Sequence, residues 1–548
     1  MNALHRTPRC IASPSPLRAS MSGRVVFGIC EHTPTHLAGP NTPGRPSHHS
    51  HAHERAPVTE HSDQRRWIVL TLLSLTQFIL VIDVSIVNVA LSSIQQALNF
   101  SESNLQWILS AYTLTFGGLL LLGGRAADLL GRRRVFMAGL VVFTVGSAAC
   151  GFAQSEVMLI LARAFQGIGA AIISPGALSI LMTTFPEGSE RNKALGIWGA
   201  IAGVGGAVGV LAGGILVQYL SWRWIFLVNV PIGIGVLIAT PKFIKESRGA
   251  QKTKLDIVGS VSITGGLALL IYGLTHAQTS SWSNTTTIAT LAASAILIIG
   301  FVVIESMVKD PILPLGIFKN RSVSGANIVG FLLGSSIFAT FFFLSLYMQQ
   351  VLGYDALSVG VRYLLLAGVI IVAAGVSQGL VTRFGVRPIL AIGMLLLCAG
   401  LLYFTQIRVT GNYLVDLVPG FILTGIGLGF AFVPVSIAAL QGVTGKLAGA
   451  ASGLINTSQQ VGGAVGIAVL STIAGTVTAN HLASAAHNVP AGANPATVQH
   501  DSLPAALVAG FHGAFYVGAA TAIIGVICAV LFLRKGGYVQ VHAEEGDA

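Results

Sequence analysis

The sequence predicts an all-α membrane protein whose helices cross the bilayer many times. Of its 548 residues, 53% are hydrophobic and only 9% are charged, which is too little charge for the surface of a soluble protein of this size. Apolar runs recur along almost the whole chain, and a run of about 20 residues is what a helix needs to cross a bilayer. The lipid bilayer is therefore the expected surroundings of this chain.

The apolar runs predict fourteen spans. Their expected limits, in chain order, are 67–91, 105–124, 135–153, 157–182, 194–217, 224–243, 256–276, 287–306, 323–350, 358–382, 388–406, 413–441, 450–475 and 506–533. The Pro-, Ser-, Arg- and His-rich stretch 1–66 has no sustained apolar run, and we expect it to be a disordered cytoplasmic tail.

The basic residues indicate which way the chain is threaded. With the N-terminus inside, the inner connecting segments hold 21 Lys and Arg, whereas the outer segments hold three, Arg223, Arg362 and Arg408. Lys and Arg accumulate in cytoplasmic loops, so both termini are expected in the cytoplasm. The same distribution accounts for the net charge of +11 without a nucleic-acid partner.

An internal repeat suggests how the spans are grouped. The pentapeptide GGAVG occurs at 205–209 in span 5 and at 462–466 in span 13, and the same shift of eight spans relates the loop after span 2 to the loop after span 10. An even shift predicts two halves of equal topology. The expected division is a tail (1–66), a six-helix half (67–243), two inserted helices with their flanking loops (244–322), a second six-helix half (323–535) and a tail (536–548).

Two halves around a central cavity are typical of secondary transporters. The chain has no P-loop, since Gly445-Lys446 is followed by leucine, so no nucleotide or other cofactor is expected. An intramembrane enzyme is disfavoured because the spans hold no His/Glu metal pair and no set of nucleophile and base. A sensor that transports nothing is a further alternative, although the N-terminal tail is a poor sensing domain.

One carboxylate lies deep inside the spans. Asp83 interrupts the apolar run FILVIDVSIVNVAL of span 1, and a charge at the bilayer centre costs about 3 kcal/mol on insertion scales. A carboxylate removed from water has a raised pKa and can bind and release a proton near neutral pH. Asp83 is thus a candidate for proton coupling, and the alternative is a structural aspartate that fixes span 1 by hydrogen bonds.

The expected partner of Asp83 is Arg163 in span 4. At about 1.5 Å of rise per residue, Arg163 lies about 9 Å and Asp83 about 12 Å below the outer surface, so the two are nearly level. An ion pair that opens when a proton arrives would link protonation to a change of conformation. A permanent structural pair is the alternative.

Several stretches resemble one family. The loop GRAADLLGRRR resembles the signature of the major facilitator superfamily, and further stretches resemble its fourteen-span drug:proton antiporters of the EmrB/QacA type. These stretches are IDVSIVNVAL, LARAFQGIGAA, SWRWIFLVNVPIG, YMQQVLGY and ASGLINTSQQVGGAVGIAV. The resemblance covers roughly residues 67–475 and implies the major facilitator fold.

The resemblance implies multidrug efflux driven by the proton gradient, with export of lipophilic, cationic small molecules by alternating access. It also implies that Arg163 takes part in proton handling. One departure bears on direction, because Val210 stands in GVLAGG where the antiporters usually carry proline. The same fold exporting one dedicated metabolite, or importing a solute, is therefore the alternative function.

The resemblance implies that the loop after span 2 is a conformational latch that holds the outward-open state. Its residues are Gly124, Asp128, Gly131, Arg132 and Arg133. Gly124 permits close approach of helices and Gly131 a tight turn. Asp128 is suited to a helix N-terminus or to an arginine partner. The run of arginines is also explained as a topology signal alone.

Small and polar residues complete the candidates. The glycines of spans 5 and 13 are expected to pack one half closely against the other; they are Gly205, Gly206, Gly209, Gly213, Gly214, Gly462, Gly463 and Gly466. Substrate contacts are expected at Gln77, Asn88, Gln166, Phe338, Phe341, Tyr347 and Gln349. Of the two polar stripes of span 1, that of Gln77 and Asn88 and that of Asp83, one is expected to line the substrate cavity and the other to meet a neighbouring helix. The rings of span 9 would otherwise face lipid.

The location and partners follow from the same reading. We expect a multi-pass protein of the bacterial inner membrane that handles a small-molecule substrate and protons. The resemblance implies that an adaptor protein is a possible partner, and a monomer is expected otherwise.

Overall fold

The computed structural model describes residues 60–185, 189–248, 256–308, 311, 313, 315–443, 445–487 and 495–533. Within them the chain is helical and contains no strand. The long helices, in chain order, are α1 (Glu60–Leu98), α3 (Trp107–Leu130), α4 (Arg132–Gly151), α5 (Glu156–Thr184), α6 (Ser189–Tyr219), α8 (Asn229–Phe243), α9 (Ile257–Thr279), α10 (Thr285–Met307), α11 (Arg321–Leu346), α12 (Ala356–Phe384), α13 (Val386–Phe404), α14 (Val418–Leu440), α15 (Gly445–His487) and α16 (Pro495–Phe532).

Short helical turns extend or precede the long helices. They are α2 (Glu102–Leu105), α7 (Trp224–Leu227), η1 (Leu315–Lys319), η2 (Tyr347–Val351) and η3 (Tyr413–Leu417). Thirteen described helices, four of them counted together with such turns, are long and apolar enough to cross a membrane. The fifth expected span falls in α6, whose apolar stretch Val204–Tyr219 is shorter. The all-α polytopic fold class is confirmed, and the number of fourteen stays a prediction.

Capping residues explain where several helices begin. Ser155 and Asp355 lie just before α5 and α12, and their side-chain oxygens accept hydrogen bonds from the backbone amides of Met158 and Ser358. Such bonds satisfy amides that have no partner within the first helical turn. Gly385, with φ of 84°, separates α12 from α13 in a conformation that favours glycine.

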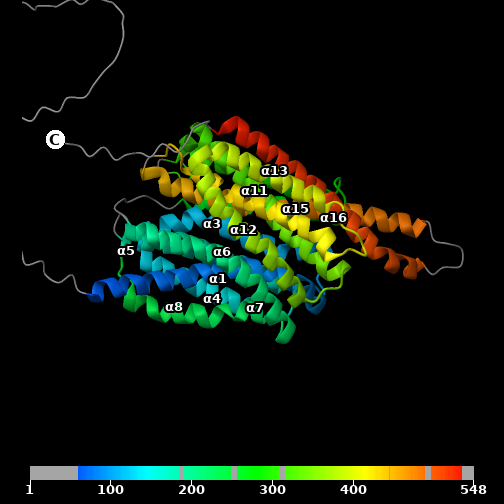
Figure 1. The fold of residues 1–548 in the computed structure, drawn as a ribbon, viewed down its shortest axis with the longest axis horizontal. Helices are drawn as coiled ribbons and strands as arrows, with labels where there is room; N and C mark the ends of the chain where they lie inside the picture. The colour runs from blue at the N-terminus through cyan, green and yellow to red at the C-terminus, as the bar shows by residue number, and fades with distance from the viewer. Residues whose placement is uncertain are drawn as a thin grey trace, which may run out of the picture. The chain divides into compact units, whose positions relative to one another are not determined.

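Three helices extend furthest beyond the predicted apolar runs. The α1 helix begins at Glu60, so residues 60–66 of the predicted tail are helical, whereas 1–59 and 536–548 lie outside the described residues. The α15 helix continues to His487 and the α16 helix begins at Pro495, seen as the orange pair in Figure 1. Apolar windows end where polarity rises, but Ala-rich segments such as TANHLASAAH remain helical.

The helices pack in two groups. Helices α1, α4 and α8 lie side by side, as do α11, α15 and α16 (Figure 1). The groups meet where α6 crosses α12 and where α15 crosses α3. In the numbering of expected spans, α6 and α12 are spans 5 and 10, and α15 and α3 are spans 13 and 2. A shift of eight spans relates span 5 to span 13 and span 2 to span 10, so it exchanges the two crossings. This exchange supports the parallel repeat, while the proposed domain boundaries stay a prediction.

The inserted pair, α9 and α10, packs as a hairpin that touches the rest of the bundle through α3 and α15. Many of its apolar side chains are exposed in the protein alone, among them Val258, Val261, Ile296 and Ile299. Apolar side chains on the outside of a membrane protein face lipid rather than water. The inserted helices therefore lie at the edge of the bundle.

Candidate functional site

A buried ion pair lies among the first helices of the chain. The Oδ2 atom of Asp83 in α1 accepts a hydrogen bond of 2.6 Å from Nη1 of Arg163 in α5, and both side chains are fully buried. The Nε atom of Arg163 donates to the backbone carbonyl of Ile108 at 3.0 Å. The two residues were expected at nearly the same depth in the membrane, and the predicted contact between them is present. Whether it couples protons stays a prediction.

Gln166 lies one turn beyond Arg163 and connects both partners of the pair. Its Oε1 atom accepts from Nη1 of Arg163 at 2.7 Å, and its Nε2 atom donates to Oδ1 of Asp83 at 2.8 Å and to Oγ of Ser147 at 3.1 Å. The side chain is fully buried. The sequence reading placed Gln166 among the substrate contacts, but the structure places it inside the ion-pair network.

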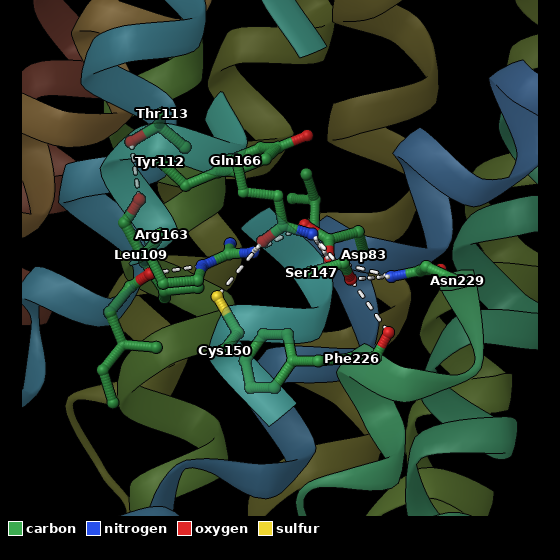
Figure 2. A network of polar contacts seen from close by, with 12 residues as sticks. Asp83, Leu109, Tyr112, Thr113, Ser147, Cys150, Arg163, Gln166, Phe226 and Asn229 are labelled. Atoms are coloured by element: carbon green, nitrogen blue, oxygen red, sulfur yellow. Dashed lines mark hydrogen bonds and ion pairs between the residues drawn. The ribbon is translucent and has the colours of Figure 1, made fainter. Parts of the chain in front are cut away.

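Two residues of this network were not predicted from the sequence. Asn229 at the start of α8 donates from Nδ2 to Oδ1 of Asp83 and to Oγ of Ser147 in α4, each at 3.2 Å. The hydroxyl of Ser147 donates a hydrogen bond to the backbone carbonyl of Phe226 at 2.8 Å. Figure 2 shows the side chains of Ser147 and Asn229 pointing toward Asp83. A search for charges misses them, although the break between α7 and α8 beside Pro231 is a usable signal.

Aromatic rings hold the cation of the pair. The guanidinium carbon of Arg163 lies 4.2 Å from the ring centroid of Tyr112 in α3 and 5.6 Å from that of Phe226. Among the described residues, Nη2 of Arg163 has no hydrogen-bond partner. A guanidinium over a ring face is stabilised by the ring quadrupole, more strongly where water is absent. The charge is therefore held by one carboxylate, two amide or backbone oxygens and two rings.

The loop between α3 and α4 is tied to the segment that follows α8. Asp128 and Arg132 form an ion pair of 2.9 Å, so the arginine partner expected for Asp128 is present. Gly131 has φ of 111°, a value that few other residues adopt, and Gly124 packs near Pro175. The backbone amide of Arg132 donates to the carbonyl of Ser247 at 2.9 Å.

Glu246 is a further partner that the sequence reading missed. Its carboxylate accepts from the backbone amides of Arg133 at 3.1 Å and Arg134 at 3.2 Å, at the first turn of α4. A carboxylate at this position satisfies free amides and opposes the positive end of the helix dipole. The latch therefore has a defined acceptor, and its role in holding one conformation stays a prediction.

The profile of the Major Facilitator Superfamily matches residues 73–467. The chain belongs to this superfamily. The chain is 37% identical over 469 residues to the puromycin resistance protein of Streptomyces alboniger, covering 85% of this chain and 90% of the relative. It is 40% identical over 413 residues to the cephamycin export protein of Amycolatopsis lactamdurans, covering 75% and 85%. The resemblance inferred from the motifs is thereby confirmed.

Solved structures agree on the major facilitator fold. A peptide transporter in complex with sulfate has a TM-score of 0.60 at 16% identity, with 84% of this chain and 94% of that chain covered. An inward-facing bacterial homologue of the human lysosomal transporter Spinster has a TM-score of 0.58 at 15% identity, with 85% and 98% covered. At such identities the likeness concerns the fold alone.

The glycines of this facilitator pack helices closely, but mostly inside one group. A Cβ atom on Gly205, Gly209 or Gly213 of α6 would meet α1, and one on the glycines of α15 would meet α11. Those α15 glycines are Gly462, Gly463 and Gly466. Gly206 has more space, with its nearest neighbour 3.9 Å away. The expected packing between halves is wrong for these positions.

Different small residues make the crossings between the groups. Gly214 of α6 faces the backbone of Ala356 in α12 at 2.9 Å, and Gly360 of α12 faces the carbonyl of Val210 at 2.7 Å, both measured from an added Cβ. Gly117 of α3 faces the Cβ atom of Gln460 in α15 at the same short range. Of the predicted set, only Gly214 lies at such a crossing. Glycine patterns alone do not reveal which neighbour a helix face meets.

The aromatic candidates of α11 and η2 pack against protein. Phe341 lies 5.2 Å from the ring of Tyr363, and Phe338 fills the space beside Gly463. Tyr347 is fully buried and donates from its hydroxyl to the carbonyl of Arg408 at 2.7 Å. The prediction of an aromatic wall open to substrate is not supported for Tyr347, whose hydroxyl has a structural partner.

One hydrogen bond beside the polar candidates joins the two groups of helices. Gln349 donates from Nε2 to Oγ of Ser345 at 2.8 Å, and Ser345 donates to the carbonyl of Asn88 in α1. The Oε1 atom of Gln77 is buried without a partner in the described part of the chain. The stripe with Asp83 meets neighbouring helices, as one of the two stripes was expected to do. At Asn88 the backbone carbonyl, not the side chain, meets α11.

A cavity of about 210 Å³ lies between the inserted hairpin and the crossing of α3 with α15. Its lining includes Ile263 and Leu267 of α9, Phe301 of α10, Phe331 of α11 and Val461 of α15. The predicted substrate contacts are not among its lining residues. This apolar space is separate from the buried ion pair.

Proposed function

We propose that this facilitator exports lipophilic small molecules in exchange for protons by alternating access. The observation that carries the proposal is the fully buried pair of Asp83 and Arg163 in two membrane helices. Buried charges in a membrane are costly and mark ion or proton pathways. Relatives named for puromycin resistance and cephamycin export support export as the direction.

In this proposal the proton binds to the carboxylate of Asp83. Protonation removes the negative charge that balances Arg163, and the pair loses its ionic attraction. The helices that the pair joins, α1 and α5, are then free to move relative to each other. A lipophilic cation bound near the pair would favour loss of the proton, because the cation and Arg163 repel each other in a low-dielectric site and an ionised Asp83 offsets that repulsion.

A dedicated exporter is a second candidate. Several relatives are named for one antibiotic each, among them the tetracenomycin C resistance and export protein of Streptomyces glaucescens, 34% identical over 411 residues. Val210 at the α6–α12 crossing, where drug antiporters usually carry proline, also leaves import as an alternative. A panel of unrelated substrates separates a multidrug exporter from a dedicated one.

The placement in the cell is part of the proposal. The inner basic segments support a bacterial inner-membrane protein with both termini in the cytoplasm. Monomeric function is proposed, with an adaptor protein as a further partner to be tested. A role as a transporter rather than an enzyme fits the superfamily to which the chain belongs.

The test uses everted vesicles with an inside-acid pH gradient and an internal pH-sensitive dye. Ethidium, tetraphenylphosphonium and puromycin are added in turn to wild type and Asp83→Asn. We expect proton release on substrate addition in wild type and none in the variant. Proton release in both would contradict a coupling role for Asp83, and no release with any of the three compounds would contradict multidrug export.

Asp355→Asn is the matched control. Asp355 caps α12 from a loop, and hydrogen bonds from Ser358 hold the pKa of its carboxyl below the usual value, so it stays charged at neutral pH. Asparagine caps a helix as well as aspartate does. This variant removes one carboxylate outside the ion-pair network and is expected to keep wild-type proton release.

A further inference from the structure

Every hydrogen-bond partner of the Asp83 carboxylate in the described structure is a donor. Arg163 donates to Oδ2, and the amide nitrogens of Gln166 and Asn229 donate to Oδ1. This environment suits an ionised carboxylate, which only accepts. A protonated carboxyl group has one hydrogen to give, and none of these three groups can accept it as arranged.

The neighbouring oxygens differ in their freedom to accept that hydrogen. The Oε1 atom of Gln166 already accepts from Arg163, which fixes the orientation of the amide. Ser147 gives its hydrogen to Phe226 and accepts from both amides. In contrast, Oδ1 of Asn229 is buried and has no hydrogen-bond partner among the described residues. Buried amide oxygens normally have a partner, so this one calls for an explanation.

We propose that Asn229 is the proton-sensing partner of Asp83 and that its carboxamide turns when Asp83 takes up a proton. In the charged state Nδ2 of Asn229 points to Oδ1 of Asp83 at 3.2 Å, as Figure 2 shows. Rotation by half a turn places Oδ1 of Asn229 near that position, where it accepts the hydrogen of the neutral carboxyl. The proposal rests on the proposed function, since it requires that Asp83 titrates.

The turn would transfer α1 from one neighbour to another. In the charged state Asp83 is bound most strongly to Arg163 of α5, by an ion pair. In the neutral state the ionic term is lost, and the carboxyl donates to Asn229 of α8 instead. Arg163 keeps Ile108, Gln166 and the face of Tyr112. Protonation of Asp83 thereby weakens the contact of α1 with α5 and strengthens its contact with α8. Alternating access needs such an exchange of contacts between helices.

The proposed function assigns the exchanged proton to Asp83. The ionisable side chains that face it and Asn229 are Tyr112 from α3, Cys150 from α4 and Arg163 from α5. The ordinary pKa values of tyrosine, cysteine and arginine all lie above neutrality. A pH-dependent signal from Asn229 therefore reports the proton on Asp83.

Infrared difference spectroscopy on the purified full-length protein, low pH minus high pH, tests the turn. Asparagine labelled with ¹³C at the side-chain carbonyl identifies amide bands. In wild type we expect a carboxylic-acid band together with a labelled amide band that moves to lower wavenumber, because the carbonyl gains a hydrogen bond. Asn229→Leu, of similar size, should remove the amide signal and move the acid band to higher wavenumber.

Two variants make the assignments and provide the control. Asp83→Asn should remove both bands, whereas Ser147→Ala, which removes another group of the same network, should keep the amide shift. An acid band without an amide shift would overturn the role of Asn229 and leave the proposed function standing. Absence of the acid band itself would overturn both, so the two failures are distinguishable.

A transport measurement tests whether the carboxylate beside Asn229 titrates, as the turn of Asn229 requires. Asn229→Asp places a second carboxylate beside Asp83, and two carboxylates that share one site raise one pKa strongly. We expect the midpoint of the pH dependence of substrate-induced proton release to rise by about one pH unit or more. An unchanged midpoint would contradict the titration of Asp83 on which the turn of Asn229 depends.

Discussion

At the residue scale, the structure shows a buried ion pair whose uncharged neighbours also make defined hydrogen bonds to it. Helix rise alone predicts that Asp83 and Arg163 are level, because depth in the bilayer depends only on residue count. The uncharged partners Ser147 and Asn229 could not be predicted in the same way. Their types are common in helices, and only the packing of four segments brings them to one point.

Removing one partner of the pair should destabilise the protein more than removing both. Asp83→Leu leaves Arg163 buried and unbalanced, and we expect a loss of about 3–5 kcal/mol in unfolding free energy. Adding Arg163→Met should restore much of that loss while transport stays absent. Thermal unfolding in detergent measures the effect. A double variant less stable than Asp83→Leu would contradict the account of the pair as mutually compensating charges.

At the element scale, glycines determine how closely two helices approach. Which helix a glycine contacts depends on which neighbour packs against its face. The repeat GGAVG predicts tight packing, and the structure confirms tight packing of α6 and α15. The sequence could not say that the partners would be α1 and α11, because a face with small residues fits any backbone that comes near. Helix limits were predicted least well where Ala-rich ends continue α15 and α16.

Gly462→Ala should weaken the α11–α15 contact. Its added Cβ would lie 2.0 Å from the carbonyl of Phe331, so a backbone must move. Gly375→Ala in α12 is the matched control, because nothing lies within 4 Å of its added Cβ. Alanine is otherwise favoured over glycine in a helix by about 1 kcal/mol. We expect a lower melting temperature for the first variant only; equal melting temperatures would contradict the assigned close contact.

Glu246→Ala should loosen the loop that joins α3 and α4. Two backbone amides at the start of α4 lose their acceptor, at a cost of about 1–3 kcal/mol if they find no other. Faster trypsin cleavage at Arg132–Arg134 in everted vesicles measures the loosening and also reports the predicted cytoplasmic side. Lys245→Gln, a change at an exposed neighbour, should leave the cleavage rate at these arginines unchanged. Slow cleavage in both variants would show that Glu246 does not hold the loop.

At the scale of the whole molecule, the arrangement follows from a few global features of the sequence. Apolar runs, the distribution of Lys and Arg and the repeat together predict a bundle of two related groups with an inserted pair. The structure and the superfamily match agree with this fold. The substrate path was harder to predict, because polar and aromatic residues such as Gln166 and Tyr347 serve helix packing here.

Alternating access requires the contacts between α1 and η2 to open. Gln350 of η2 donates to Oε1 of Gln95 at the end of α1 at 2.7 Å. In a background with Cys10, Cys30 and Cys528 changed to serine, cysteines at both glutamines and a short bismaleimide should abolish transport. Each single cysteine treated alike should transport normally. Transport by the cross-linked protein would contradict opening at this end.

The measurement that tests the central claim most directly is proton release by purified protein when substrate binds. A weakly buffered detergent solution at several pH values reports the protons set free as puromycin or tetraphenylphosphonium is added. We predict that wild type releases protons near neutral pH and that Asp83→Asn releases none while Asp355→Asn matches wild type. Equal release from wild type and Asp83→Asn would contradict the claim that Asp83 carries the exchanged proton.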